Sequence, residues 1–208
     1  MRSKKQPDDQ KRTFVDEARR AQLIRCTIEA IDELGFHKAS LAEIAKSAGI
    51  TKGAIFYHFA NRDELIDSVA AEVAGAGMAY ILPKVQAAET PRAQLRAYVE
   101  AFVSALDVDP AAIRVLYAIG QSSYDAEGHS KYIDDRELQE TAIAPLEEIL
   151  RRGQESGELG EFDIRSMALM IRSTLEALPH TARGYPDLDL TAYGQNLITF
   201  FERGCGVP

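Results

Sequence analysis

Residues 39–65 read ASLAEIAKSAGITKGAIFYHFANRDEL, and this stretch carries the clearest structural signals in the chain. Ser40 stands at an N-cap position, and Glu43 three residues later completes the pattern of a capping box, in which each side chain bonds a backbone amide of the first turn. Four apolar residues at helical spacing then form one narrow face: Leu41, Ile44, Ala45 and Ala48. The pattern predicts a helix that begins after Ser40.

A tight turn and a second helix are expected directly afterwards. Gly49 follows the last apolar position, as glycine commonly does at the end of a helix, and Ile50 can fill the corner. Thr51 then offers a second N-cap. The second helix must be short, because Asn61 and Asp63 are cap residues for another helix. The order helix, turn, helix is therefore predicted.

The second helix is expected to have a buried side and an exposed side. Ile55 and Phe59 are four residues apart and would face the first helix. The residues left toward solvent are Lys52, Gly53, Phe56 and Tyr57. A cation, a backbone left bare by glycine and aromatic edges at the start of a helix suit the major groove of DNA, where side chains meet base edges and phosphates. The interpretation is a DNA-recognition helix.

These residues resemble the DNA-binding helices of TetR-type transcriptional regulators, over roughly residues 14–65. The positions that agree with the family pattern in type and spacing are Gly49, Thr51, Gly53, Tyr57, His58, Phe59 and Leu65. The resemblance implies an all-α fold, with an N-terminal three-helix DNA-binding domain of helix-turn-helix type and a larger C-terminal helical domain for ligand binding and dimerisation. It also implies that a small-molecule effector most commonly releases the protein from its operator.

The resemblance also implies a set of DNA contacts. These are Ser40 and Thr51 on phosphates, Lys52, Gly53 and Ala54 near bases, Tyr57 and His58 on the backbone, and Arg62 on a phosphate. Two positions depart from the family pattern. Phe56 stands where the family usually has Tyr, which removes a phenolic hydrogen bond to phosphate, and Arg62 replaces the commoner Lys while keeping its charge.

The charge distribution fits a DNA-binding head on an acidic body. The net charge of the 208 residues is −8, but residues 1–60 carry eleven Lys/Arg against eight Asp/Glu, which leaves −11 for the remainder. A basic head meets polyanions, whereas an acidic body is repelled by them. The basic residues of the first thirteen positions either lie along DNA as an arm or form a solvated tail, and the sequence leaves both readings open.

The chain is predicted to be all-α, because apolar residues recur at helical spacing and no alternating strand pattern occurs. Beyond the opening stretch, helices are expected at 13–34, 62–79, 91–106, 110–122, 136–154, 163–178 and 190–203. The predicted organisation is a disordered basic arm over 1–13, a helix-turn-helix domain over 14–60, and a helical effector-binding and dimerisation domain over 61–208.

Polar residues on the otherwise apolar helices of the body are candidates for an effector pocket. They are Tyr98, Tyr117, Gln121, Tyr124, Arg172, Glu176 and His180. Helical bundles bind small molecules in mostly apolar clefts with a few placed polar groups. For any one of these tyrosines, a core ring with its hydroxyl at the surface is the alternative.

The last two predicted helices are apolar on more than one side, which favours a partner subunit as the cover. The candidate dimer residues are Met170, Ser173, Ala177, Tyr193, Leu197, Phe200 and Phe201. Central helices of a larger monomeric core are the alternative. Pairing of two small heads is also the usual way to bind an operator well.

Three classes of function fit these observations to different degrees. The first is a ligand-responsive repressor with operator DNA, a second copy of the chain and an unidentified small-molecule effector as partners. The second is a DNA-binding protein whose body recruits a protein partner. An enzyme is disfavoured, because the sequence has no Gly-rich phosphate loop, no nucleophile motif and no metal-ligand spacing, so neither cofactor nor metal is expected.

A cytoplasmic location away from the membrane is expected. The N-terminal basic residues have no apolar segment behind them, and the most apolar run, residues 69–82, contains Glu72 and is shorter than the roughly 20 residues that span a bilayer. Cys26 and Cys205 are too few for a disulfide framework.

Overall fold

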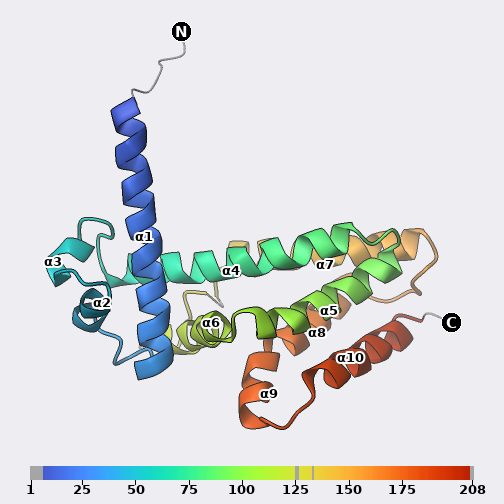
Figure 1. Cartoon of the computed structure of the whole chain (residues 1–208). Helices are drawn as coiled ribbons and strands as arrows, with labels where there is room; N and C mark the ends of the chain where they lie inside the picture. Colours follow the sequence, from blue (N-terminus) through green and yellow to red (C-terminus); the bar gives the residue numbers. More distant parts are fainter. Residues whose placement is uncertain (1–6, 125–126, 133, 207–208) are drawn as a thin grey trace. The chain divides into compact units, whose positions relative to one another are not determined.

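The computed structural model describes residues 7–124, 127–132 and 134–206, and helices make up nearly all of their regular structure (Figure 1). In chain order they are α1 (Pro7–Leu34), α2 (Leu41–Ser47), α3 (Lys52–Ile55), α4 (Arg62–Gln86), α5 (Pro91–Val108), α6 (Pro110–Ser122), α7 (Arg136–Glu155), α8 (Ile164–Glu176), α9 (Leu178–Gly184) and α10 (Leu190–Gly204). Within these residues, β pairing is confined to an isolated bridge between Tyr124 and Ser130. The all-α prediction is confirmed.

The described chain forms two compact units. Unit 1 contains the chain up to Val73 together with Arg114–Ser122, and unit 2 contains Ala74–Ile113 and the chain from Ser123 onward. The boundary predicted from the sequence lies after residue 60 and leaves all of α6 in the body. The units instead divide inside α4, after Val73, and inside α6, after Ile113. Both helices carry buried apolar residues along their length, so the division does not coincide with a loop that could be recognised in the sequence.

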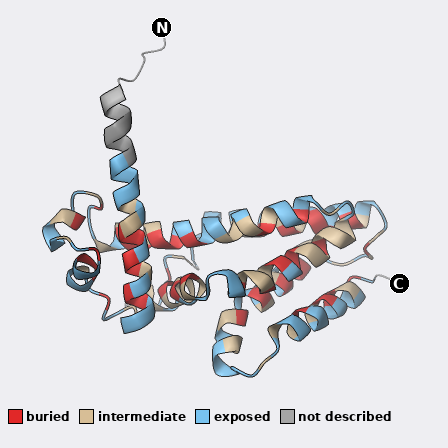
Figure 2. Cartoon of the chain, in the orientation of Figure 1, coloured by how far each residue is buried: buried red, intermediate tan, exposed pale blue. Residues whose placement is uncertain are grey.

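Unit 1 is built from α1, α2, α3, the first half of α4 and most of α6. α1 packs on α2, and α2 packs on α3. Figure 2 shows buried positions along α1 and α2, and the fully buried large side chains of this unit are Leu23, Ile44, Ile55, Phe59, Leu65 and Ile119. The helices and turns of residues 39–65 thus share one hydrophobic core with α1.

The start of α1 differs from its prediction. The helix begins at Pro7 rather than at residue 13, so residues 7–12 of the predicted disordered arm are helical. Proline is well suited to a first helical position, because it has no amide hydrogen to leave unbonded there and its φ is already helical. Residues 1–6 of the predicted arm lie outside the described residues.

α4 also runs further than predicted, to Gln86 rather than to about residue 79, with Pro83 inside it. Proline cannot donate the helical hydrogen bond at its position, which normally favours a helix end. Here Ile81 and Val85, on either side of Pro83, are buried in the core of unit 2, and the Ala87 amide still donates to the Pro83 carbonyl at 3.0 Å. The burial of these residues therefore stabilises α4 as a helix that continues past Pro83.

Among the described residues, α4 is the one helix that is long and apolar enough to cross a membrane, by length and composition alone. A third of its most apolar window is buried inside the protein. Core helices of soluble proteins pass the same test, so the helix is weak evidence for a membrane.

Unit 2 is a bundle centred on α5, which packs against α7, α8 and α10, while α7 packs on α8 and α8 on α9. Its largest fully buried side chains are Leu95, Ile143, Leu146, Leu150, Ile171 and Leu175. The predicted helix over 163–178 is two helices, α8 and α9. Pro179, the second residue of α9, cannot donate a hydrogen bond to the carbonyl of Leu175, which ends α8 near Glu176.

Candidate nucleic-acid interface

The first helix of the motif is held at its start by a single cap. Ser40 has extended backbone angles, and its hydroxyl accepts the Glu43 amide at 3.3 Å. The reciprocal half of the predicted capping box is absent from this site. The Ser40 amide donates to the Lys38 carbonyl at 2.8 Å, and the Glu43 carboxylate lies 3.9 Å from the Lys46 ammonium. The Ser40 amide is thus bonded to the Lys38 carbonyl instead of the Glu43 carboxylate, and that carboxylate lies near Lys46 instead.

The turn between α2 and α3 is made by Gly49, whose φ of +67° is a left-handed conformation that glycine adopts without strain. The amide of the next residue, Ile50, donates back to the Ala45 carbonyl at 2.9 Å, which closes the end of α2. Thr51 then caps α3 by accepting the Ala54 amide at 3.3 Å. The predicted order of glycine, corner residue and N-cap is confirmed.

α3 separates buried from exposed residues as its spacing predicted. Ile55 and Phe59 are 0% and 1% exposed, whereas Phe56 and Tyr57 are 47% and 84% exposed. Lys52 and Gly53 are exposed as well. The Tyr57 and His58 rings meet edge to face, with their centres 5.6 Å apart. α3 and the turn after it thus present a cation and a phenol to solvent, while Ile55 and Phe59 are buried beneath them.

Gly53 has no internal reason to be glycine. Its φ is not in the left-handed range, and an added Cβ would meet nothing closer than the Thr51 hydroxyl at 3.9 Å. Glycine in a helix costs about 1 kcal/mol relative to alanine. A bare backbone at an exposed position is consistent with the close approach of something outside the chain.

The remaining predicted DNA residues differ in how free they are. Ser40 and Thr51 are exposed and Ala54 and His58 are half-buried. Arg62 is half-buried and already engaged, because its guanidinium donates to the Phe36 carbonyl at 2.8 Å and lies 4.6 Å from the centre of the Phe36 ring. Its predicted role as a phosphate anchor stays a prediction. A phosphate bound there would contact a guanidinium that also holds the turn between α1 and α2 through Phe36.

Sequence reasoning missed Arg20 of α1. Its guanidinium donates to the His58 carbonyl and lies 4.1 Å from the centre of the Phe59 ring. The same side chain is 3.6 Å from the Glu64 carboxylate. No local pattern identifies such a residue, because its partners lie 38 or more positions further along the chain.

The predicted effector residues do not gather at one place. Tyr98 is buried in unit 2, where burial raises the pKa of its phenol and the charge of Arg172 opposes that rise. Glu176 also acts on Tyr98, so these three predicted residues lie near one another. Tyr117 and Gln121 belong to unit 1, Tyr124 is exposed beside the bridge to Ser130, and His180 is exposed on α9 rather than on the helix of Arg172.

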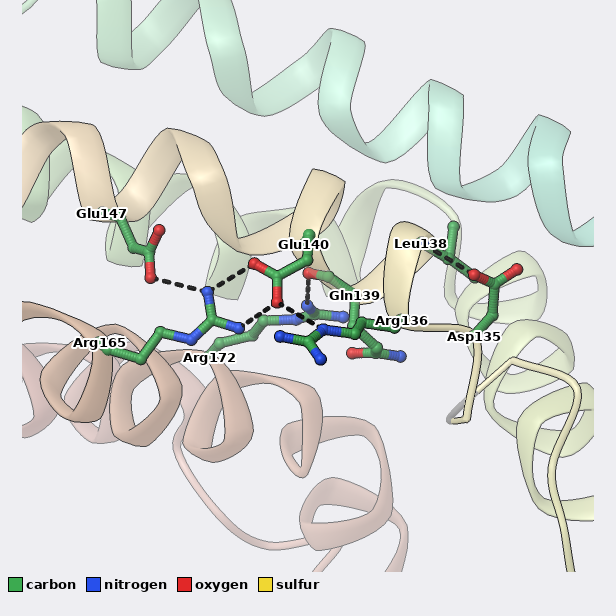
Figure 3. A network of polar contacts seen from close by, with 8 residues as sticks. All are labelled: Asp135, Arg136, Leu138, Gln139, Glu140, Glu147, Arg165 and Arg172. Carbon is green, nitrogen blue, oxygen red and sulfur yellow. Dashed lines mark hydrogen bonds and ion pairs between the residues drawn. The ribbon is translucent and has the colours of Figure 1, made fainter.

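The polar groups near Tyr98 are bonded to other protein groups. Arg172 donates to the Glu176 carboxylate at 2.6 Å. It also donates to the Gln139 carbonyl at 3.1 Å (Figure 3). Next to it, Arg165 of α8 binds Glu140 of α7 at 2.5 and 2.7 Å. These bonds hold the pKa of the Glu140 carboxyl below its usual value. The network therefore joins α7 to α8, and among the described residues every buried side-chain nitrogen and oxygen has a partner.

Two hollows lie elsewhere in unit 2. One, of about 540 Å³, is lined by residues of α9, α10 and the loop between them: Thr181, Gly184, Tyr185, Pro186, Asp187, Leu188 and Tyr193. The other, of about 470 Å³, is lined by Ser123, His129, Ser130, Lys131, Asp134 and Asp135. No residue predicted to bind an effector lines either hollow.

The predicted dimer residues divide by exposure. Met170, Ser173 and Ala177 are exposed on α8, and Phe200 is 68% exposed on α10. Tyr193 and Leu197 are half-buried against the core. Phe201 is 3% exposed within its own chain, so its assignment to a subunit interface was wrong. Successive residues of a helix point about 100° apart, and Phe201 shares the inward side of α10 with Ile198 and Cys205.

The motif consists of a capped helix, a glycine turn and a short second helix with an exposed start, and a larger helical unit follows it in the chain. This arrangement is that of a DNA-binding transcriptional regulator of helix-turn-helix type. The family model described as bacterial regulatory proteins of the tetR family matches residues 23–69. The HTH-type transcriptional regulator BetI of Yersinia pestis is 30% identical over 148 residues, which cover 65% of this chain and 71% of that protein. The chain belongs to the tetR family of bacterial regulatory proteins.

Other relatives match over shorter lengths. BetI 1 of Chromohalobacter salexigens is 37% identical over 83 residues, or 39% of this chain and 41% of the relative. BetI of Stenotrophomonas maltophilia is 35% identical over 105 residues, or 49% and 52%. The chain thus spans about half the length of these two curated relatives. These relatives are HTH-type transcriptional regulators.

Solved structures agree with the fold over nearly the whole chain. FadR of Bacillus subtilis, determined in complex with stearoyl-CoA, has a TM-score of 0.76 at 24% identity and covers 88% of this chain and 98% of that one. The ketosteroid transcriptional regulator KstR2 of Mycobacterium tuberculosis has a TM-score of 0.66 at 23% identity, covering 89% and 94%. At these identities the likeness shows the fold.

Proposed function

We propose that this protein is a cytoplasmic repressor that binds operator DNA as a homodimer and leaves it when a small molecule binds unit 2. The observation that carries the proposal is the start of α3. There Lys52 and Gly53 are exposed behind the Thr51 cap, and Tyr57 stands 84% exposed one turn later. Such a surface has no use in the packing of the chain itself.

The proposed contacts follow from the chemistry of these groups. The Ser40 and Thr51 hydroxyls accept cap bonds but keep their own protons, which they can donate to phosphate oxygens. The start of α3 also carries Lys52, whose charge favours a phosphate or a guanine edge. The bare backbone at Gly53 allows α3 to approach the bases closely.

A dimer is proposed because two recognition helices must meet successive major grooves, roughly 34 to 36 Å apart. The exposed apolar side chains of unit 2 support α8 and α10 as its interface. Leu169 and Met170 on α8 are 45% and 52% exposed, and Phe200 on α10 is 68% exposed. Apolar groups of this size lose unfavourable contact with water when a second copy covers them.

The effector is placed in unit 2, near Tyr98, because this tyrosine is buried in an apolar bundle and the charges of the half-buried Arg172 and the exposed Glu176 act on it. The release mechanism rests on differential affinity. A ligand that prefers a shape of unit 2 incompatible with operator spacing must weaken DNA binding, and the operator must weaken ligand binding by the same factor.

The DNA-binding part is tested with a duplex that the wild-type protein selects from a random 20-bp library. Lys52→Ala and Tyr57→Ala should weaken binding to this duplex at unchanged thermal stability. Lys84→Ala, an exposed lysine of unit 2, is the matched control and should bind as wild type. Lys52→Ala should lower the salt slope by about one if Lys52 meets a phosphate, or relax base preference if it meets a base. Wild-type binding by both Lys52→Ala and Tyr57→Ala would contradict the assignment.

The regulatory part is tested by thermal-shift screening of a metabolite panel that includes stearoyl-CoA and ketosteroids. Any hit is then titrated with and without the selected duplex, and the two ligand affinities should differ by roughly 5 to 150-fold. Equal affinities would mean that the ligand does not regulate DNA binding. A protein without any hit that retains DNA binding would favour recruitment of a protein partner instead.

A further inference from the structure

α3 is too short to hold its own orientation. It has four residues, Lys52–Ile55, and the turn after it is closed by backbone bonds from the His58 and Phe59 amides to the Ile55 carbonyl at 2.9 and 3.0 Å. One or two helical turns are not stable in isolation, because nucleation of a helix is unfavourable. The direction in which α3 presents its exposed residues must therefore be fixed from outside the helix.

Arg20 supplies that fixation from α1. One guanidinium nitrogen donates to the His58 carbonyl, and the guanidinium carbon lies 4.1 Å from the centre of the Phe59 ring. A second nitrogen reaches α4, at 3.6 Å from the Glu64 carboxylate and 3.5 Å from the Ser68 hydroxyl. One planar side chain thus connects α1, the turn that follows α3, and α4.

Glu64 completes the arrangement. Its second carboxylate oxygen accepts the Ala60 amide at 2.6 Å, so the three residues directly after the α3 turn are all held: His58 by its carbonyl, Phe59 by its ring and Ala60 by its amide. Phe59 is 1% exposed and cannot move without opening the core of unit 1. The exposed Tyr57 is adjacent to this fixed segment.

We propose that Arg20 is a positioning residue for DNA recognition, which fixes the end of the recognition helix and does not itself contact DNA. This inference rests on the proposed DNA-binding function. Arginine fits the role because its planar group donates several hydrogen bonds at fixed angles while its face stacks on a ring, which lysine cannot reproduce. The neighbouring Arg19 offers a contrast, since it is exposed and its guanidinium donates within α1, to the Gln22 side chain at 2.7 Å.

The test compares Arg20→Gln with Arg19→Gln, two substitutions that remove the same charge from adjacent positions of one helix. The first readout needs no DNA. Amide hydrogen exchange at His58, Phe59 and Ala60 should become about tenfold faster or more in Arg20→Gln than in Arg19→Gln, while exchange at Val99 of unit 2 stays equal. Equal exchange of the three amides in both variants would overturn the positioning role, even if the protein proved not to bind DNA.

The second readout uses the selected duplex and a scrambled duplex over a salt series. Arg20→Gln should weaken binding to the selected duplex about tenfold relative to Arg19→Gln, with the same salt slope and the same affinity for the scrambled duplex. A salt slope lower by about one, with equal losses on both duplexes, would identify Arg20 as a phosphate contact and overturn the proposal.

Arg20→Lys keeps the test decisive if Arg20→Gln does not fold. The lysine retains the charge but can reach only one acceptor at a time. Arg20→Lys should therefore show faster amide exchange at residues 58–60 than the wild type. Its affinity for the selected duplex should be lower than that of the wild type but not abolished. Wild-type behaviour of Arg20→Lys in both readouts would mean that charge alone suffices and that the planar geometry is irrelevant.

Discussion

Gly153→Ala is expected to destabilise the protein although alanine is the better helix former. Gly153 lies in the last turn of α7, and a Cβ built there would come 2.4 Å from Cδ1, 2.6 Å from Cγ and 3.3 Å from Cβ of Leu159. Leu159 cannot simply move away. It is 4% exposed within the core of unit 2, and its amide donates to the carbonyl of Gly153 itself at 2.9 Å.

The magnitude follows from two opposing effects. Replacing a helical glycine by alanine stabilises a helix by about 1 kcal/mol, whereas forcing an extra carbon into a packed core costs about 1 to 3 kcal/mol. The difference between these effects is a net loss of about 0 to 2 kcal/mol in the free energy of unfolding. Since two leucine atoms would lie well inside contact distance, the upper half of this range, about 1 to 2 kcal/mol, is expected. The melting temperature should fall by about 2 to 8 °C.

Thermal and urea unfolding followed by circular dichroism, at one fixed protein concentration, measures the effect. Gly75→Ala is the matched control, because Gly75 lies inside α4 with nothing within 4 Å of its built Cβ, and this substitution should stabilise the protein. In a Leu159→Ala background the two closest atoms, Cδ1 and Cγ, are gone and Cβ remains at 3.3 Å, so Gly153→Ala should become stabilising and the double-mutant cycle should show a coupling of about 1 to 3 kcal/mol. A rise in stability for Gly153→Ala alone, or zero coupling, would refute the reasoning.

Three further outcomes are expected. Phe200→Arg should shift the protein from dimer to monomer in analytical ultracentrifugation at unchanged helicity, because a charge replaces an exposed apolar ring of the proposed interface; a wild-type monomer at micromolar concentration would contradict the dimer. Burial raises the pKa of the Cys205 thiol to about 11, so in a Cys26→Ser variant no thiol should react rapidly with Ellman's reagent at pH 8 until urea is added, and rapid labelling of the native protein would disprove this protection. The bidentate hydrogen bonds from Arg114 lower the pKa of Asp32, so the carboxylate stabilises the fold above the unfolded pKa of about 3.9 and loses this effect as pH falls below it. Asp32→Asn should therefore lower the unfolding free energy by about 0.2 to 1 kcal/mol at pH 7 and by progressively less as the pH falls below about 3.9, and a pH-independent difference would exclude the ion pair as its cause.

The sequence by itself determined the helix-turn-helix and its exposed surface. Ser40, Gly49 and Thr51 act through their own backbone or through amides three residues away, so their type and position are enough to define where helices begin and turn. The four-residue spacing of Ile55 and Phe59 likewise fixed which side of α3 faces inward and left Tyr57 outside. These signals are local, and local signals can be read from the chain.

Only the tertiary structure decided features that depend on partners far away in sequence. Arg20 has the same local context as Arg19, and the carbonyl and ring that distinguish it are brought to it by folding. α4 continues through Pro83 because the surrounding apolar residues are buried, a long-range packing effect that outweighs the local cost of proline. Phe200 and Phe201 are chemically identical neighbours, and the choice of which one enters the core was made by the rotation of α10 against α5.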